Sequence, residues 1–205
     1  MSFTERHVET DGVRIRYLEA GQGAPLVYVH GAGTLEITSA HDLLARRFRV
    51  IALESPADAD ACSTQSTSVL TSSMLRAIQT LGVETFNLVG SSVGGPTALW
   101  MALQAPSRIL ALVLEAPDRD VDLERRLPDL ASPTLVLVGT RQVSTAQEMG
   151  RACKERIPNC HLVFVYDAGS AIGRDRPEAF AEVVTDFLER HEAFVISRTE
   201  TVIHP

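Results

Sequence analysis

The sequence lacks the features that mark a secreted or membrane protein. Its first residues, Met1 to His7, contain no apolar signal-peptide segment, and no apolar run approaches the length needed to cross a bilayer. Cysteine is scarce: the three present, Cys62, Cys153 and Cys160, leave an odd thiol if any two pair. We therefore expect a cytoplasmic protein whose cysteines are reduced, buried, small apolar residues.

Basic charge is also in deficit. The chain has 19 Lys and Arg against 26 Asp and Glu, which gives a formal net charge of -7 at pH 7. Nucleic acids and anionic lipid surfaces usually bind basic proteins, so we expect neither as a partner. The sequence contains no phosphate loop, dinucleotide fingerprint or metal-ligand cluster, so it predicts no cofactor and no metal.

What is present suits one globular unit. A chain of 205 residues with 45% hydrophobic and 22% charged residues can bury a substantial core, and its length fits one domain better than two. We assign residues 1–190 to a single domain and 191–205 to a tail, which is either an added strand or disordered. The sequence leaves the oligomeric state open, and a homo-oligomer is one possibility.

Apolar runs typical of strands alternate with helical stretches along most of the chain. Asp11-Gly12 favours a tight turn between two short opening strands. The strand-like runs are Val8–Thr10, Val13–Leu18, Pro25–Val29, Arg49–Leu53, Phe86–Val89, Ile109–Leu114, Thr134–Val138 and Leu162–Tyr166. The helical stretches are Ser39–Arg46, Thr67–Leu81, Gly94–Gln104, Ala146–Arg156 and Pro177–Arg190. This alternation predicts an α/β fold, a mostly parallel central sheet with helices on both faces.

The Ser- and Thr-rich segment from Ser63 to Ser73 is the one polar patch of low complexity. We expect its first half to be a loop.

A serine motif lies between a predicted strand and a predicted helix. Gly90-Ser91-Ser92-Val93-Gly94 follows the pattern G-x-S-x-G, and this context makes an otherwise weak motif informative. The small flanking residues allow a sharp turn, and the helix N-terminus favours developing negative charge near Ser92. Ser91 is interpreted only as a small residue that the turn tolerates. The motif predicts Ser92 as a nucleophile position.

A second motif, His30-Gly31-Ala32-Gly33, follows the strand-like run that ends at Val29. With the serine motif it makes the chain resemble the α/β-hydrolase family, in particular serine esterases and lipases, from about Val8 to Arg190. The resemblance implies that Ala32 and Val93 donate the two backbone N–H groups of an oxyanion hole. We expect His30 to have a structural role, bonding backbone groups.

The chain departs from that family at the two other positions of the catalytic triad. The resemblance places the triad acid at Gln142 and the triad histidine at Ser170, and no histidine lies between His161 and His191. Asp118 or Asp120 is an alternative acid, although the simpler interpretation of both is a solvated turn. His204 in the tail is the one histidine that reach alone does not exclude as a base.

The connection between the sixth and seventh of the eight strand-like runs is short. Only Pro117 to Ser132 lies where many α/β-hydrolases insert a helical cap, so we expect no cap domain and an open site. Without an acid and a histidine, Ser92 lacks a general base, which typically contributes ~10²- to 10⁴-fold to the rate. The sequence therefore favours a non-catalytic protein that binds an acyl or carboxylate small molecule or serves as an interaction partner. The alternative is a serine hydrolase acting on esters with an unusual or missing base.

Overall fold

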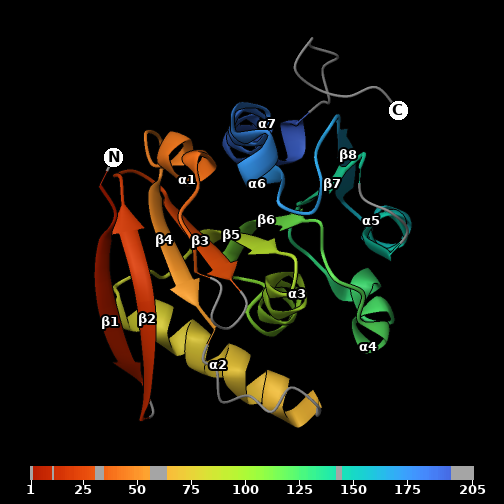
Figure 1. The fold of residues 1–205 in the computed structure, drawn as a ribbon. Coiled ribbons are helices and arrows are strands. Elements are labelled where there is room, and N and C mark those ends of the chain that lie inside the picture. The colour runs from red at the N-terminus through yellow and green to blue at the C-terminus, as the bar shows by residue number, and fades with distance from the viewer. Residues whose placement is uncertain (1, 11, 31–34, 56–63, 142–144, 195–205) are drawn as a thin grey trace.

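The structure is a computed structural model, and it describes residues 2–10, 12–30, 35–55, 64–141 and 145–194 (Figure 1). Its strands form one eight-stranded sheet with the order β1-β2-β4-β3-β5-β6-β7-β8. The strands are β1 Thr4–Thr10, β2 Val13–Ala20, β3 Pro25–His30, β4 Arg49–Glu54, β5 Phe86–Ser91, β6 Ile109–Glu115, β7 Thr134–Gly139 and β8 Cys160–Val165. The α-helices are α1 Ser39–Leu44, α2 Thr64–Thr80, α3 Gly94–Gln104, α4 Val121–Glu124, α5 Thr145–Arg156, α6 Ile172–Asp175 and α7 Pro177–Arg190, and two short 3₁₀ helices span Leu127–Asp129 and His191–Ala193.

The sheet is mostly parallel, as the alternation predicted. The strands β3 to β8 pair in parallel, whereas β2 pairs antiparallel with both β1 and β4. Gly12, at a φ of +76°, lies in the turn that joins the opening hairpin. All six residues of β7 are buried, which explains why its sequence is a continuous apolar run rather than an alternating one.

Helices cover both faces of the sheet and create two hydrophobic cores (Figure 1). One core joins the sheet to α2, α3, α4 and α5, and includes Met74, Leu99 and Met149. The other joins it to α1, α6 and α7, and includes Leu44 and Phe180. The sheet is thus the middle layer of three, and its carboxyl edge is the place where a site can open.

One helix prediction was wrong. The first half of the segment Ser63 to Ser73 was expected to be a loop, but α2 begins at Thr64. Hydroxyls here bond within the helix and to the neighbouring one: Ser72 donates to the Ser68 carbonyl at 2.8 Å, and Gln104 of α3 donates to the Ser68 hydroxyl at 3.0 Å. Contacts with α3 therefore hold a sequence that by itself favours turns.

The connection between β6 and β7 holds only α4 and one 3₁₀ turn, so no cap domain covers the carboxyl edge of the sheet there. None of the helices in the described ranges has the length and apolarity that a bilayer crossing requires. Cys153 and Cys160 are unpaired and buried, and burial raises the pKa of each thiol to about 12. Cys62 lies outside the described residues.

Candidate active site

Ser92 occupies the strained turn that the serine motif predicts. Its φ is +48°, a left-handed conformation that side-chain-bearing residues seldom adopt and that costs ~1–3 kcal/mol. Backbone hydrogen bonds hold it there. The Ser92 N–H donates to the Glu115 carbonyl at 2.8 Å, and the Ser92 carbonyl accepts from the Gly95 N–H at 2.9 Å. The end of β6 therefore fixes the position of the serine.

The glycines on either side are required by close packing. A Cβ on Gly94 would lie 2.2 Å from the Val29 carbonyl oxygen, and one on Gly90 would lie 2.5 Å from the Ala98 Cβ. The backbone of α3 thus approaches β3 and β5 at distances that no side chain permits. The G-x-S-x-G spacing is a steric requirement of this turn.

Val93 stands at the N-terminus of α3, where no side chain caps the helix. Within the described ranges its N–H has no hydrogen-bond partner, and its side chain is 56% exposed. This N–H group is available to bind an oxygen atom, as an oxyanion donor would be. The second predicted donor, Ala32, lies outside the described residues.

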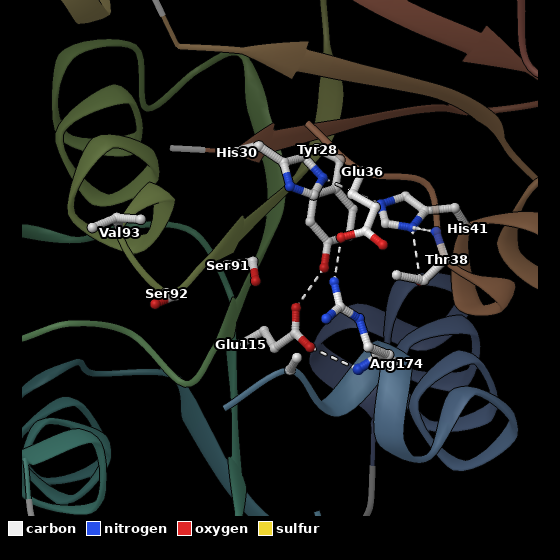
Figure 2. Close-up of a pocket in the computed structure, with 12 residues that line it drawn as sticks. Tyr28, His30, Glu36, Thr38, His41, Ser91, Ser92, Val93, Glu115 and Arg174 are labelled. Atoms are coloured by element: carbon white, nitrogen blue, oxygen red, sulfur yellow. Dashed lines mark hydrogen bonds and ion pairs between the residues drawn. The ribbon is translucent and has the colours of Figure 1, made fainter. Parts of the chain in front are cut away.

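A pocket of about 210 Å³ opens beside the serine turn (Figure 2). It lies over the carboxyl ends of β3, β5 and β6, where the strand order changes direction, the usual place for a ligand in such sheets. Its lining is predominantly polar or ionisable and comprises Tyr28, His30, Glu36, Thr38, His41, Ser91, Ser92, Val93, Glu115, Ala171, Gly173 and Arg174.

Glu115 is a carboxylate buried at the floor of this pocket, with 3% of its surface exposed. Its Oε2 accepts a 2.6 Å hydrogen bond from the Tyr28 hydroxyl, and its Oε1 accepts a 2.7 Å bond from the Gly173 N–H. Figure 2 shows the Tyr28 hydroxyl and the Glu115 carboxylate pointing toward each other. Burial, and then the charge of Glu115, raise the pKa of Tyr28 well above its usual value, so the phenol keeps its proton and donates it.

Two histidines form one wall of the pocket. The Nδ1 of His41 accepts the Thr38 N–H at 3.1 Å, which leaves the His41 proton on Nε2. That Nε2 lies 3.3 Å from the Nε2 of His30 and therefore donates to it. Both rings pack on Tyr28, with centroids 4.7 Å away for His30 and 4.4 Å away for His41. Among the described residues, the contacts of the His30 side chain are with these two rings, and the expected bonds of His30 to backbone groups stay a prediction.

Burial keeps both imidazoles uncharged at neutral pH. It lowers the pKa of His30 to about 4 and that of His41, which is the more buried, to about 3. For His41 the neighbouring His30 lowers the pKa further. Two protonated rings at this separation would also repel each other.

An ion pair between Glu36 and Arg174 crosses the mouth of the pocket (Figure 2). Both side chains are more than half exposed, so the pair joins the segment before α1 to α6 at the surface. Beneath it, α6 packs closely on α1 and on the floor residue Glu115: a Cβ on Gly173 would lie 3.2 Å from the Ala40 Cβ and 3.6 Å from Glu115 Oε1. The pocket is thus partly covered although a cap domain is absent.

Comparison with known proteins agrees with this geometry. Residues 24–132 match the family model described as alpha/beta hydrolase fold. The chain belongs to this family. It is 28% identical over 184 residues to Protein ABHD14A of Rattus norvegicus, covering 84% of this chain and 74% of that protein. It is also 32% identical over 115 residues, 53% of this chain, to the dihydrolipoyllysine-residue acetyltransferase component of the acetoin cleaving system of Cupriavidus necator.

Coverage of the relatives is partial. The match spans 31% of the Cupriavidus necator protein and 42% of a 2-hydroxy-6-oxo-6-(2'-aminophenyl)hexa-2,4-dienoic acid hydrolase of Metapseudomonas resinovorans. Among solved structures, a CIB-like hydrolase of Thermoplasma acidophilum superposes with a TM-score of 0.77 at 18% identity, covering 92% of this chain and 98% of that one. The structural likeness at this identity concerns the fold.

The resemblance to the α/β-hydrolase family assigned the two other triad positions to Gln142 and Ser170. Gln142 lies outside the described residues. Ser170 is exposed in the loop after β8 and does not line the pocket. Arg141 joins the two loops: its guanidinium contacts Asp175 at 2.8 Å and Asp167 at 3.5 Å. An arginine–aspartate cluster therefore links the two loops from which the family supplies its acid and histidine.

The alternative acids and bases have other surroundings. The Asp120 carboxylate accepts the N–H groups of Asp122 and Leu123 and so caps α4, a structural role that differs from the solvated turn expected from the sequence. Asp118 is exposed. His161 is the second residue of β8, at the end of the strand opposite the pocket, as expected, and packs against Phe194. His204 lies outside the described residues.

Sequence reasoning missed three residues that define the pocket, namely Tyr28, His41 and Glu115. Glu115 had a usable signal, because it is the one charged residue in the apolar run Ile109–Glu115 and stands at the carboxyl end of that strand. Tyr28 had none, since an aromatic residue in a buried strand is ordinary core. Tyr28 and Glu115 are 87 positions apart, and only the strand order brings them together.

Proposed function

We propose that this chain binds a small acyl-type ligand in the pocket beside Ser92 and does not hydrolyse it. The observation that carries the proposal is the isolation of the serine hydroxyl. Within the described ranges, the Ser92 side chain has no hydrogen-bond partner, and Ser170 replaces the histidine that the family places after β8. A serine hydroxyl without a base is a poor nucleophile.

The pocket histidines are poor substitutes for that base. With pKa values of about 4 and 3, His30 and His41 lie far below the range near neutrality in which a general base is effective. The Nδ1 of His41 is already engaged by Thr38. Figure 2 also shows Ser91, rather than Ser92, as the serine beside the Tyr28 hydroxyl.

Features suited to binding are nevertheless retained. The Val93 N–H is available to an acyl oxygen at the N-terminus of α3, where the helix dipole favours negative charge. The pocket beside it is large enough for a small molecule. These features support binding of a carbonyl or carboxylate oxygen at the nucleophile elbow, the serine turn of residues 90–94.

A fluorophosphonate probe tests this function, since it labels serines that a base activates. We expect no labelling of Ser92 above the level of a Ser92→Ala control when modified peptides are located by mass spectrometry beside a reactive hydrolase. Labelling confined to Ser92 would contradict the proposal.

A serine ester hydrolase is the second candidate, and one observation favours it. Ser92 keeps a φ of +48°, although glycine would adopt this conformation at lower cost. Strain of this kind concentrates at functional sites. Ester hydrolysis that titrates near the pKa of an ordinary histidine and disappears in Ser92→Ala would support this candidate, with His204 the first residue to replace.

A further inference from the structure

The charges around the pocket do not balance. Glu36 and Glu115 contribute two carboxylates, and Arg174 contributes one guanidinium, which is paired with Glu36 at the mouth. The two histidines add no charge at neutral pH. In the part of the chain that the structure describes, Glu115 has no cationic partner. The pocket therefore has one more carboxyl group than it has cationic side chains, and that carboxyl group lies at its floor.

Glu115 also keeps unused hydrogen-bonding capacity. Each of its oxygens accepts one hydrogen bond from the described residues, Oε2 from Tyr28 and Oε1 from Gly173, whereas an ionised carboxylate can accept about four. The residue lines the cavity, so a ligand can reach it. A buried carboxylate without a cation costs free energy, and a ligand that supplies charged donors offsets that cost.

The same carboxylate disfavours an anion. A ligand carboxylate at the floor would face Glu115 across a small, partly buried space, and like charges at such separations repel. The acyl end of a ligand can bind the Val93 N–H, but its other end meets a negative charge.

We propose that the pocket binds a ligand carrying a protonated primary amine, which donates hydrogen bonds to Glu115. This inference rests on the proposed function and specifies its ligand class: an amine-bearing acyl compound or a simple alkylammonium ion, in preference to a free carboxylic acid. The Tyr28 ring, which packs against both imidazoles, fixes one donor to Glu115, and Gly173 fixes the other.

Three matched probes test the ligand class on the complete chain. n-Butylammonium, butyramide and butyrate are titrated at neutral pH and constant ionic strength, and binding is followed through the backbone amide signals of Ser91, Gly173 and Arg174 in ¹H–¹⁵N NMR spectra. We expect n-butylammonium to bind at least tenfold more tightly than butyramide, and butyrate to bind most weakly. A charge-assisted hydrogen bond accounts for a factor of this order.

Two variants identify the residue responsible. Glu115→Gln keeps the shape and an acceptor but removes the charge, and should weaken n-butylammonium binding about ten- to a hundredfold. Glu182→Gln, on an exposed position of α7, removes the same charge from the whole protein and should leave binding unchanged. If Glu115→Gln does not fold, the comparison of the three probes on the unaltered chain decides alone.

The outcomes separate this inference from the proposed function. Butyrate binding as tightly as n-butylammonium would overturn the amine proposal and leave ligand binding intact. KCl alone producing the same shifts would overturn the amine proposal, because the signals would then respond to salt and not to the amine. No response of the pocket amides to any probe would overturn both. Labelling of Ser92 by the fluorophosphonate, together with an amine preference, would overturn the non-catalytic function and support the amine proposal.

Discussion

The serine turn and the loops after β7 and β8 are two halves of one family site, and they differ in what fixes them. Around Ser92 the geometry depends on backbone approach: Gly94 and Gly90 leave no space for a Cβ, and the Glu115 carbonyl holds the serine N–H. In the two loops, surface side chains make the contacts, with Arg141 between Asp167 and Asp175. Residues of the serine turn cannot be substituted without disturbing the sheet, whereas residues of the two loops can.

On our proposal that the chain lacks the family's acid and histidine, this difference explains how the family fold can persist without them. Substitution of an exposed loop residue usually changes stability by less than ~0.5 kcal/mol, so the position of Ser170, which is exposed, is open to change. The glycines of the serine turn are not open to change in this way, because the packing of α3 requires them whether or not the serine is catalytic. Retention of the motif is therefore weaker evidence for hydrolysis than the motif alone suggests.

The largest expected effect comes from a methyl group on the elbow. Gly94→Ala would place a Cβ 2.2 Å from the Val29 carbonyl oxygen, and should lower the free energy of unfolding by ~3 kcal/mol or more. Gly82→Ala is the matched control: Gly82 has a φ of +74° with no atom near its Cβ position, so only backbone strain of ~1 kcal/mol is added. Urea unfolding measures both. Equal losses would show that the close packing at Gly94 is unimportant.

Restoring the missing side chains tests the loop half. Gln142→Asp together with Ser170→His should raise hydrolysis of an aryl ester ~10²-fold above the same variant carrying Ser92→Ala, the lower end of what a general base contributes. The lower end is expected because Ser170 is exposed and does not line the pocket. Ser170→His alone should give less, since its tautomer is then not fixed.

A cooperative melt establishes that the double variant folds. If it folds and its rate equals that of its Ser92→Ala version, the two loops differ from an active site by more than two side chains. The Arg141 cluster would then be the next feature to alter.

Acid should lower the free energy of unfolding through the two pocket histidines, His30 and His41. Their folded-state pKa values, about 4 for His30 and about 3 for His41, are below the ordinary 6.5, so the unfolded chain binds more protons as pH falls below 6.5. Each histidine should therefore cost ~1.4 kcal/mol of stability between pH 7.5 and pH 5.5. The loss continues until the pH reaches the folded-state pKa values.

The variant His41→Asn isolates this effect, since an amide oxygen can accept the Thr38 N–H in place of Nδ1. It should remove about half of the contribution that His30 and His41 together make to the pH dependence, as measured by urea unfolding at several pH values. His7→Asn, at an exposed position of β1, is the control and should not change the slope. Identical slopes for the unaltered chain and His41→Asn would contradict the assignment.

The same contrast shows how much of the molecule could be predicted from its sequence. The bounds of α3 and α7 agree with prediction because Gly94 and Pro177 mark their first residues. The helices α4 and α6 were missed because four residues are too few to show a period. Ser92 could be placed because its motif is local.

The pocket could not be placed from local signals. Tyr28, His41 and Glu115 belong to three elements that only the sheet order and the packing of α1 bring together. The ion pair of Glu36 with Arg174 joins residues 138 positions apart. Such contacts depend on tertiary structure, so a resemblance that identifies the elbow leaves the chemistry of its ligand open.

The smallest expected effect is on stability, and it tests whether the backbone strain at Ser92 serves a function or is merely tolerated. Ser92 and Asp167 both follow a strand with positive φ, +48° and +55°, one in each half of the site. Ser92→Gly should stabilise the protein by ~0.5–1 kcal/mol, because relief of ~1–2 kcal/mol of strain exceeds the entropy that glycine adds to the unfolded chain. Asp167→Gly should give no gain, since aspartate tolerates this conformation and its contact with Arg141 would be lost. Thermal and urea unfolding of the two variants decide the matter. A gain in stability confined to Ser92→Gly means that the folded protein carries an avoidable backbone strain at Ser92, which is expected where the serine side chain itself contacts a ligand. Equal gains in the two variants mean that the strain at Ser92 is only a consequence of how the chain turns after the strand.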